Sequence, residues 1–287
     1  MANFLGIMLL WLALMVLPAG PVGAADGSQP SVSPRVLITG SNRGIGLEFA
    51  RQYAEQGWQV IATCRSPAKA EALQAIAAKH ANVRIQAMDI ADGDSVDALA
   101  EALRDQPVDL LLNNAAYLGQ PGEQQFPDID FDVFARILAV NTMGTTRVTI
   151  AFREHVLASN QKKIVILGSA AGSIGQVSAA PNTYLPYRAS KAGLHLIARN
   201  LSFALAEEGI TVGLINPGLV DTRGVLDRQP GEPVPEEFVP IMPLIEQGII
   251  ELQRPADAVR DMRVQIDAMS LQTPGLFMNY DGREVPW

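Results

Sequence analysis

A tyrosine and a lysine four residues apart form the pair of side chains best suited to chemistry in this sequence. Tyr187 and Lys191 stand in the segment Tyr-Arg-Ala-Ser-Lys, and residues four apart lie on one face of a helix. A neighbouring ammonium stabilises a phenolate, so we expect Lys191 to lower the pKa of the Tyr187 phenol. Such a pair can donate and accept the proton that the interconversion of a carbonyl and an alcohol requires.

A glycine-rich turn far upstream predicts a binding site for a dinucleotide. The turn reads Thr-Gly-Ser-Asn-Arg-Gly-Ile-Gly over residues 39–46, between an apolar strand and a helical pattern. Glycines there let backbone N–H groups approach a pyrophosphate, whose charge the helix N-terminus stabilises. The spacing differs from the commoner G-x-G-x-x-G fingerprint. The turn residues expected at the cofactor are Gly40, Asn42, Arg43, Gly44, Ile45 and Gly46.

The end of the second predicted strand indicates which dinucleotide binds. An NAD site usually has an acid there, which accepts hydrogen bonds from the ribose 2′-hydroxyl. This strand ends in Thr63-Cys64-Arg65 and has no acid. Arg65, and Arg43 in the glycine turn, can instead pair with a 2′-phosphate. The sequence therefore favours NADP(H) over NAD(H).

Two further strand ends carry candidate cofactor contacts. Asp89 and Ile90 follow the third predicted strand, where they can bond the adenine amino group and pack on its ring. Asn114 and Ala115 follow the fourth, beside the expected pyrophosphate and ribose. Ser169 follows the fifth, so it should emerge into the same crevice as Tyr187.

Alternating apolar runs and helical patterns predict a single α/β domain over residues 35–287. We expect a doubly wound, Rossmann-type parallel sheet of about seven strands, with helices on both faces and ligands at the strands' carboxyl ends. Long helices are expected over about 131–158 and 185–208, and the last strand over 275–279. Five prolines interrupt residues 223–254, which we interpret as a substrate lid or, equally, a plain surface loop.

Composition excludes several other classes of protein. A net charge of −8 argues against a nucleic-acid partner. One cysteine and three scattered histidines give no metal site. Residues 1–25 carry no charge and contain an apolar run over 4–17, which suits a signal peptide, an uncleaved anchor or a mis-assigned start. Residues 26–34 form a polar linker. We expect export or membrane tethering through this segment and no other membrane domain; a mis-assigned start would leave the protein cytoplasmic.

Taken in order, these motifs resemble the short-chain dehydrogenase/reductase family over essentially residues 35–287. The shared features are the glycine turn, Asn-Asn-Ala-Ala, the serine after the fifth strand, Tyr-x-x-x-Lys and the Pro-Gly pair followed by Asp-Thr. The turn, the Arg65 strand end and the C-terminal tail are similar to those of C-factor and sniffer-type carbonyl reductases.

The resemblance implies a role for each site residue. Tyr187 would be the general acid, Lys191 would lower its pKa and bind the nicotinamide ribose, and Ser169 would bond the substrate oxygen. Asn141 would hold a water that links Lys191 to solvent. Pro217, Gly218 and Thr222 would border the nicotinamide.

Several alternatives stay open. Ser173 is a second candidate for the serine, and Tyr184 is a rival tyrosine that more plausibly lines the substrate crevice. A dinucleotide-binding sensor with little catalysis is the main alternative function, and isomerisation or dehydration with a retained cofactor is a third. A small carbonyl or alcohol is the expected partner, and a homo-oligomer is compatible with family habit.

Overall fold

The computed structural model describes residues 33–177, 184–229, 231–239 and 241–287. The expected signal or anchor at residues 1–25 and nearly all of the linker at 26–34 lie outside the described residues. They stay predictions from the sequence.

A parallel sheet forms the centre of the domain, and within the described residues it has seven strands in the order β3-β2-β1-β4-β5-β6-β9. All neighbouring pairs are parallel. The predicted doubly wound α/β fold is therefore confirmed. The strands are β1 (Arg35–Ile38), β2 (Gln59–Cys64), β3 (Val83–Ala87), β4 (Leu110–Asn113), β5 (Lys163–Leu167), β6 (Thr211–Asn216) and β9 (Phe277–Asn279).

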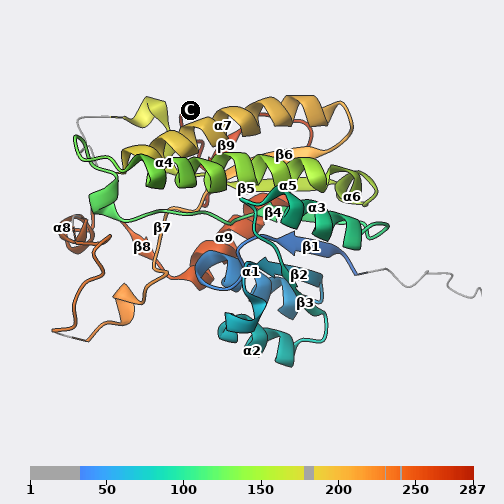
Figure 1. Ribbon diagram of the computed structural model, residues 1–287, viewed down its shortest axis with the longest axis horizontal. Helices are drawn as coiled ribbons and strands as arrows, with labels where there is room; N and C mark the ends of the chain where they lie inside the picture. The colour runs from blue at the N-terminus through green and yellow to red at the C-terminus, as the bar shows by residue number, and fades with distance from the viewer. Residues whose placement is uncertain (1–32, 178–183, 230, 240) are drawn as a thin grey trace, which may run out of the picture. The chain divides into compact units, whose positions relative to one another are not determined.

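Helices cover both faces of the sheet (Figure 1). Alternate residues of a strand point to opposite faces, so Val36 and Ile38 pack into one core cluster and Leu37 into the other. The first cluster includes side chains of α1 (Gly44–Glu55), α2 (Glu71–Lys79) and α9 (Pro255–Ala268). The second includes side chains of α3 (Gly93–Ala102), α5 (Thr145–Ala151), α6 (Arg153–Leu157) and α7 (Leu185–Ala206).

The long helix expected over 131–158 is interrupted twice. It begins as α4 (Phe131–Leu138), continues as a π-helical turn over Ala139–Gly144, and resumes as α5. A second break at Phe152, where ψ is 4°, separates α5 from α6. π-Helical turns often occur at functional sites, and this one contains the buried Asn141.

Helix α9 is absent from the sequence-based prediction. Its signals are present, because Pro255 occupies the first turn and Asp257 adds a negative charge near the N-terminus. The helix followed directly on the proline-rich segment, whose irregularity masked its beginning.

Residues 223–254 contain short elements and a small core of their own. Strand β8 (Leu252–Gln253) pairs in parallel with β7 (Leu219–Val220), and α8 spans Met242–Glu246. Val225 and Phe238 are buried against Leu252. Short 3₁₀ turns span Pro67–Lys69, Pro121–Glu123, Ala170–Gly172, Ile174–Gln176 and Val225–Asp227. Over the described part of the chain, no helix has the length and apolar character needed to cross a membrane.

Candidate active site

Lys191 anchors helix α7 to the end of the central strand β5. Its side chain is 4% exposed, and Nζ donates a hydrogen bond of 2.8 Å to the carbonyl oxygen of Leu167, the last residue of β5. Burial lowers the pKa of Lys191 to about 8. The ammonium lies 5.9 Å from the centre of the Tyr187 ring, so the two groups share one site as the spacing predicted.

The Tyr187 phenol interacts with the side chain of Ser169. Burial raises the pKa of the Tyr187 phenol above its ordinary value, and the bond to Ser169 offsets part of that rise. The expected lowering of this pKa by Lys191 is therefore wrong for this structure, because the Lys191 ammonium is directed to the Leu167 carbonyl and loss of water dominates. The phenol is held in its protonated form.

The two candidate serines have different partners. Ser169 lies just after β5 and contacts Tyr187, while its Oγ also accepts a bond from the Ala171 N–H at 3.2 Å. Ser173 is buried, and its hydroxyl donates to the carbonyl of Pro286 in the C-terminal tail. Ser169, and not Ser173, is thus placed beside the tyrosine.

Asn141 lies in the π-helical turn and is 1% exposed. Its Oδ1 accepts from the Tyr117 N–H at 2.7 Å, and its Nδ2 donates to the Tyr117 carbonyl and to Ser190 Oγ, both at 3.0 Å. The side chain therefore fixes the loop after β4 to the helix that carries Tyr187. The Asn141 side chain is already engaged in these three hydrogen bonds, so a water that links Lys191 to solvent would need another partner.

Tyr184 immediately precedes α7, with a left-handed backbone φ of 58°. Its buried hydroxyl has no hydrogen-bond partner among the described residues. Burial, and then the charges of Glu237 and Glu236, raise the pKa of Tyr184 to about 12. These acids belong to residues 223–254, so Tyr184 faces the expected lid and not Lys191.

The glycine turn has a geometry that larger residues would not allow. Gly40 and Gly44 have φ values of 68° and 55°, in the left-handed region that favours glycine. A Cβ on Gly46 would come within 2.3 Å of the Gly40 carbonyl oxygen and 2.4 Å of Asn114 Nδ2. The turn is therefore packed tightly between α1 and the loop after β4.

The N-terminus of α1 presents open backbone donors. Its N-cap residue, Arg43, makes no side-chain cap, and the first turn carries no acid. Unpaired N–H groups and the helix dipole favour an anion at such an end. Arg43 and Arg65 are both exposed, and among the residues that the structure describes neither side chain makes a hydrogen bond or an ion pair. These features fit a phosphate-bearing cofactor. Asn42 is exposed and Ile45 is half-buried in the same turn.

Of the residues expected to contact the cofactor after β3 and β4, several form hydrogen bonds within the protein. Asn114 Nδ2 donates to the carbonyls of Thr39 (2.8 Å) and Gly40 (3.1 Å), so its side chain holds the glycine turn. The Thr39 hydroxyl accepts from the N–H groups of Asn114 and Ala115. Asp89 accepts from the Ala91 N–H, and Ile90 is buried beside it.

The loop after β6 is shaped by Asp221, to which the sequence analysis assigned no role. Gly218 has a φ of 73°, and Pro217 before it is half-buried. The buried Asp221 accepts backbone bonds from Val225 (2.8 Å) and Leu226 (2.7 Å). It thereby fixes the turn that carries the exposed Thr222 and leads into residues 223–254.

His195 and Gln124 also contact the site, although the sequence analysis assigned them no role there. His195 Nε2 accepts from the Ser169 N–H at 3.3 Å. Burial, and then the charge of Lys191, lower the pKa of His195 to about 4, so the ring is neutral near pH 7. Gln124 Oε1 accepts from the Tyr187 N–H at 3.1 Å. The i+4 spacing from Lys191 could have indicated His195, whereas no local pattern indicates Gln124.

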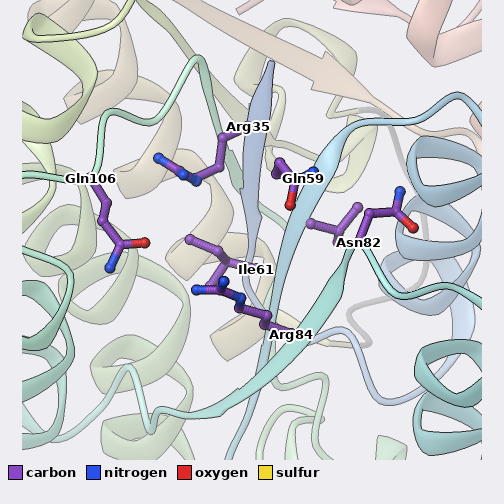
Figure 2. A pocket seen from close by; sticks show the side chains of 7 residues that line it. Arg35, Gln59, Ile61, Asn82, Arg84 and Gln106 are labelled. Carbon is purple, nitrogen blue, oxygen red and sulfur yellow. The ribbon is translucent and has the colours of Figure 1, made fainter. Parts of the chain in front are cut away.

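A small cavity of about 30 Å³ lies at the amino ends of β1, β2 and β3. Figure 2 shows it near the first residues of the strands, with Arg35, Gln59 and Arg84 among the side chains that line it. Ligands of open parallel sheets bind at the strands' carboxyl ends, so this cavity is separate from the candidate active site.

Substitution of Gly172 tests whether α7 must lie as close to the turn after β5 as it does. A Cβ there would come within 2.6 Å of Lys191 Cβ and 2.7 Å of the Lys191 carbonyl carbon. We expect Gly172→Ala to lower the free energy of unfolding by about 1–3 kcal/mol and to displace Lys191. On the same helix, Gly193→Ala meets nothing closer than 3.6 Å and should not destabilise. Thermal unfolding of both variants checks this, and equal midpoints would contradict it.

Comparison with known sequences shows the family of this chain. The sequence model of short chain dehydrogenase matches residues 34–232. An uncharacterized oxidoreductase of Schizosaccharomyces pombe is 32% identical over 257 residues, which cover 88% of this chain and 97% of that protein.

Solved structures of the same fold include proteins with either nicotinamide cofactor. An NADPH-bound carbonyl reductase from chicken fatty liver is 26% identical, with a TM-score of 0.74 over 89% of this chain and 94% of that one. A 3-oxoacyl-[acyl-carrier protein] reductase from Brucella melitensis in complex with NAD is also 26% identical, with a TM-score of 0.72 over 88% and 96%. The carbonyl reductase Sniffer of D. melanogaster, 23% identical, has the same fold, with a TM-score of 0.72 over 89% and 100%. The chain is an oxidoreductase that belongs to the short-chain dehydrogenase family.

Proposed function

We propose that this protein is an NADP(H)-dependent carbonyl reductase, or alcohol dehydrogenase in the reverse direction, with Tyr187 as general acid. One observation carries the proposal: the Tyr187 phenol interacts with the Ser169 side chain, and the buried ammonium of Lys191 lies 5.9 Å from the centre of the Tyr187 ring. A protein that only binds a dinucleotide has no need of an acid, a buried cation and a hydroxyl at one point.

The described residues fit a nicotinamide dinucleotide. The tight turn at Gly40, Gly44 and Gly46 and the uncapped N-terminus of α1 suit a pyrophosphate. Arg43 and Arg65 suit a 2′-phosphate, and Asp89, Ile90 and Ala115 lie after the neighbouring strands. Pro217, Gly218 and Thr222 would border the nicotinamide. The cofactor supplies or accepts the hydride, and the protein supplies position and charge.

In the direction of reduction, the Tyr187 phenol donates its proton to the substrate oxygen. Its raised pKa keeps that proton in place until the oxygen becomes basic. The Ser169 hydroxyl donates a hydrogen bond to the same oxygen, where negative charge develops. Lys191 stabilises the phenolate that remains, because its charge lies 5.9 Å from the ring centre in a buried setting.

Residues 223–254 are proposed as the lid over the substrate. Support comes from Tyr184, whose phenol feels the charges of Glu236 and Glu237, and from Asp221, which fixes the start of the segment. A small core around Phe238 makes the segment a structured unit. Substrate selection would therefore depend on Tyr184 and this segment. Export through residues 1–25 and assembly into homo-oligomers stay predictions from the sequence.

The proton donor is tested by Tyr187→Phe. Removal of the hydroxyl should leave NADPH affinity unchanged and lower kcat by about 10²- to 10⁴-fold, the usual contribution of a general acid. Tyr184→Phe is the matched variant, and its kcat should fall far less. Steady-state kinetics and fluorescence titration with NADPH measure both. A greater loss of kcat in Tyr184→Phe than in Tyr187→Phe would show that Tyr187 is not the proton donor.

Preference for the 2′-phosphate is tested by Arg65→Gln. Loss of a charge-assisted contact should raise the Kd for NADPH by about 10- to 100-fold and leave the Kd for NADH nearly unchanged. Arg84→Gln removes an exposed arginine of β3 near the amino ends of the strands and serves as control. If Arg65→Gln raises the Kd for NADPH and the Kd for NADH by the same factor, Arg65 does not recognise the 2′-phosphate.

The pH profile tests the buried ammonium. Burial lowers the pKa of Lys191 to about 8, so its charge is present below that pH and is lost above it. Stabilisation of the Tyr187 phenolate is lost with it, and kcat/KM for reduction should fall as pH rises through about 8. In Lys191→Met, kcat/KM should be much lower at every pH, and its decrease through about pH 8 should be absent. A wild-type profile that stays level to pH 10 would contradict this role.

A further inference from the structure

The first turn of α7 receives its hydrogen-bond acceptors from a distant loop. The N-cap residue, Tyr184, provides no side-chain cap, and Pro186 has no N–H. The two remaining N–H groups before the first intrahelical bond belong to Leu185 and Tyr187. Both donate to Gln124, to its backbone carbonyl at 3.2 Å and to its Oε1 at 3.1 Å.

The orientation of the Gln124 amide is fixed by its other partners. Gln124 is fully buried, at 0% exposure. Its Nε2 donates to the carbonyls of Leu118 (2.7 Å) and Gln120 (3.1 Å). A flipped amide would set oxygen against two carbonyls and an NH₂ group against the Tyr187 N–H, so all three side-chain hydrogen bonds of Gln124 would be lost. The acceptor is therefore held facing Tyr187.

The loop that carries Gln124 is clamped at its other end by Asn141. Asn141 makes two bonds to the backbone of Tyr117, at 2.7 and 3.0 Å. Just before Tyr117, Asn114 and Ala115 are bonded to the Thr39 hydroxyl and so to the glycine turn. Residues 117–124 thus connect the expected cofactor site to the first turn of the helix that bears Tyr187.

We propose that Gln124 is a positioning residue for catalysis, which caps α7 from outside the helix and so holds the Tyr187 phenol at the reacting atoms. The proposal rests on the proposed function, since it assumes that Tyr187 transfers the proton. Small displacements of a reacting group can lower rates strongly. Gln124 itself touches neither substrate nor cofactor in this account.

The test is Gln124→Met, which keeps the length of the side chain and removes the three hydrogen bonds of the side-chain amide. The backbone carbonyl of residue 124 still accepts from the Leu185 N–H. We expect faster amide hydrogen exchange in the peptide over residues 185–190, a kcat about tenfold lower, and a Kd for NADPH within twofold of wild type. The matched control is Gln52→Met, which removes bonds to Ala256 and Arg263 from a buried glutamine of α1. It should lower stability and leave both the 185–190 exchange and kcat unchanged.

Two results would overturn the proposal: unchanged exchange over residues 185–190 in Gln124→Met, or faster exchange there with wild-type kcat. If Gln124→Met does not fold, Gln124→Glu is the second variant: its carboxyl, protonated in this buried position, keeps an acceptor for the Tyr187 N–H and one donor for the carbonyl of Leu118 or Gln120. It should show exchange over residues 185–190 near that of wild type and a kcat lowered by less than tenfold. A kcat as low as that of Tyr187→Phe would then contradict the proposal. The proposed function fails separately, if wild type and Tyr187→Phe turn over alike, and the exchange readout still decides whether Gln124 holds the helix.

Discussion

One buried contact fixes the geometry on which the site depends. The ammonium of Lys191 is bonded to the carbonyl of Leu167, where β5 ends. Because the chain continues from Leu167 into Ser169, the same joint sets the distance between the serine and α7. A buried charge requires such a partner, since loss of water is costly for an ammonium. The absence of a side chain at Gly172 lets the helix approach closely enough to make the contact.

Backbone hydrogen bonds extend this order to the rest of the site. Thr39 and Asn114 join the glycine turn to the end of β4. Asn141 and Gln124 join the loop after β4 to α7, and His195 ties α7 back to Ser169. The supports come from five separate segments of the chain. Each of them holds a backbone position, so the groups proposed for chemistry need little rearrangement of their own.

The fold and the central pair could be predicted because their signals are local. Strand and helix periods, the glycine turn and the four-residue spacing of Tyr187 and Lys191 all lie within short windows. The direction in which the Tyr187 pKa is shifted could not be predicted, because it depends on how much water reaches the phenol and on where the Lys191 ammonium points. The role of Gln124 depends on a pairing across 63 residues, and the π-helical turn at Asn141 leaves no mark on the helical period. The choice between Ser169 and Ser173 could not be made from the sequence either, because the Ser173 hydroxyl is bonded to the carbonyl of Pro286, which is 113 residues away in the chain.

The central claim is that this site transfers hydride between NADPH and a carbonyl, and it is tested most directly with the wild-type protein. NADPH binding would be measured by titration, and NADPH oxidation would then be followed with a panel of aldehydes, ketones and quinones. We predict saturable binding together with oxidation in the presence of at least one carbonyl, with the corresponding alcohol or hydroquinone as product. Tight binding without oxidation by any member of the panel would contradict the claim and favour a dinucleotide sensor.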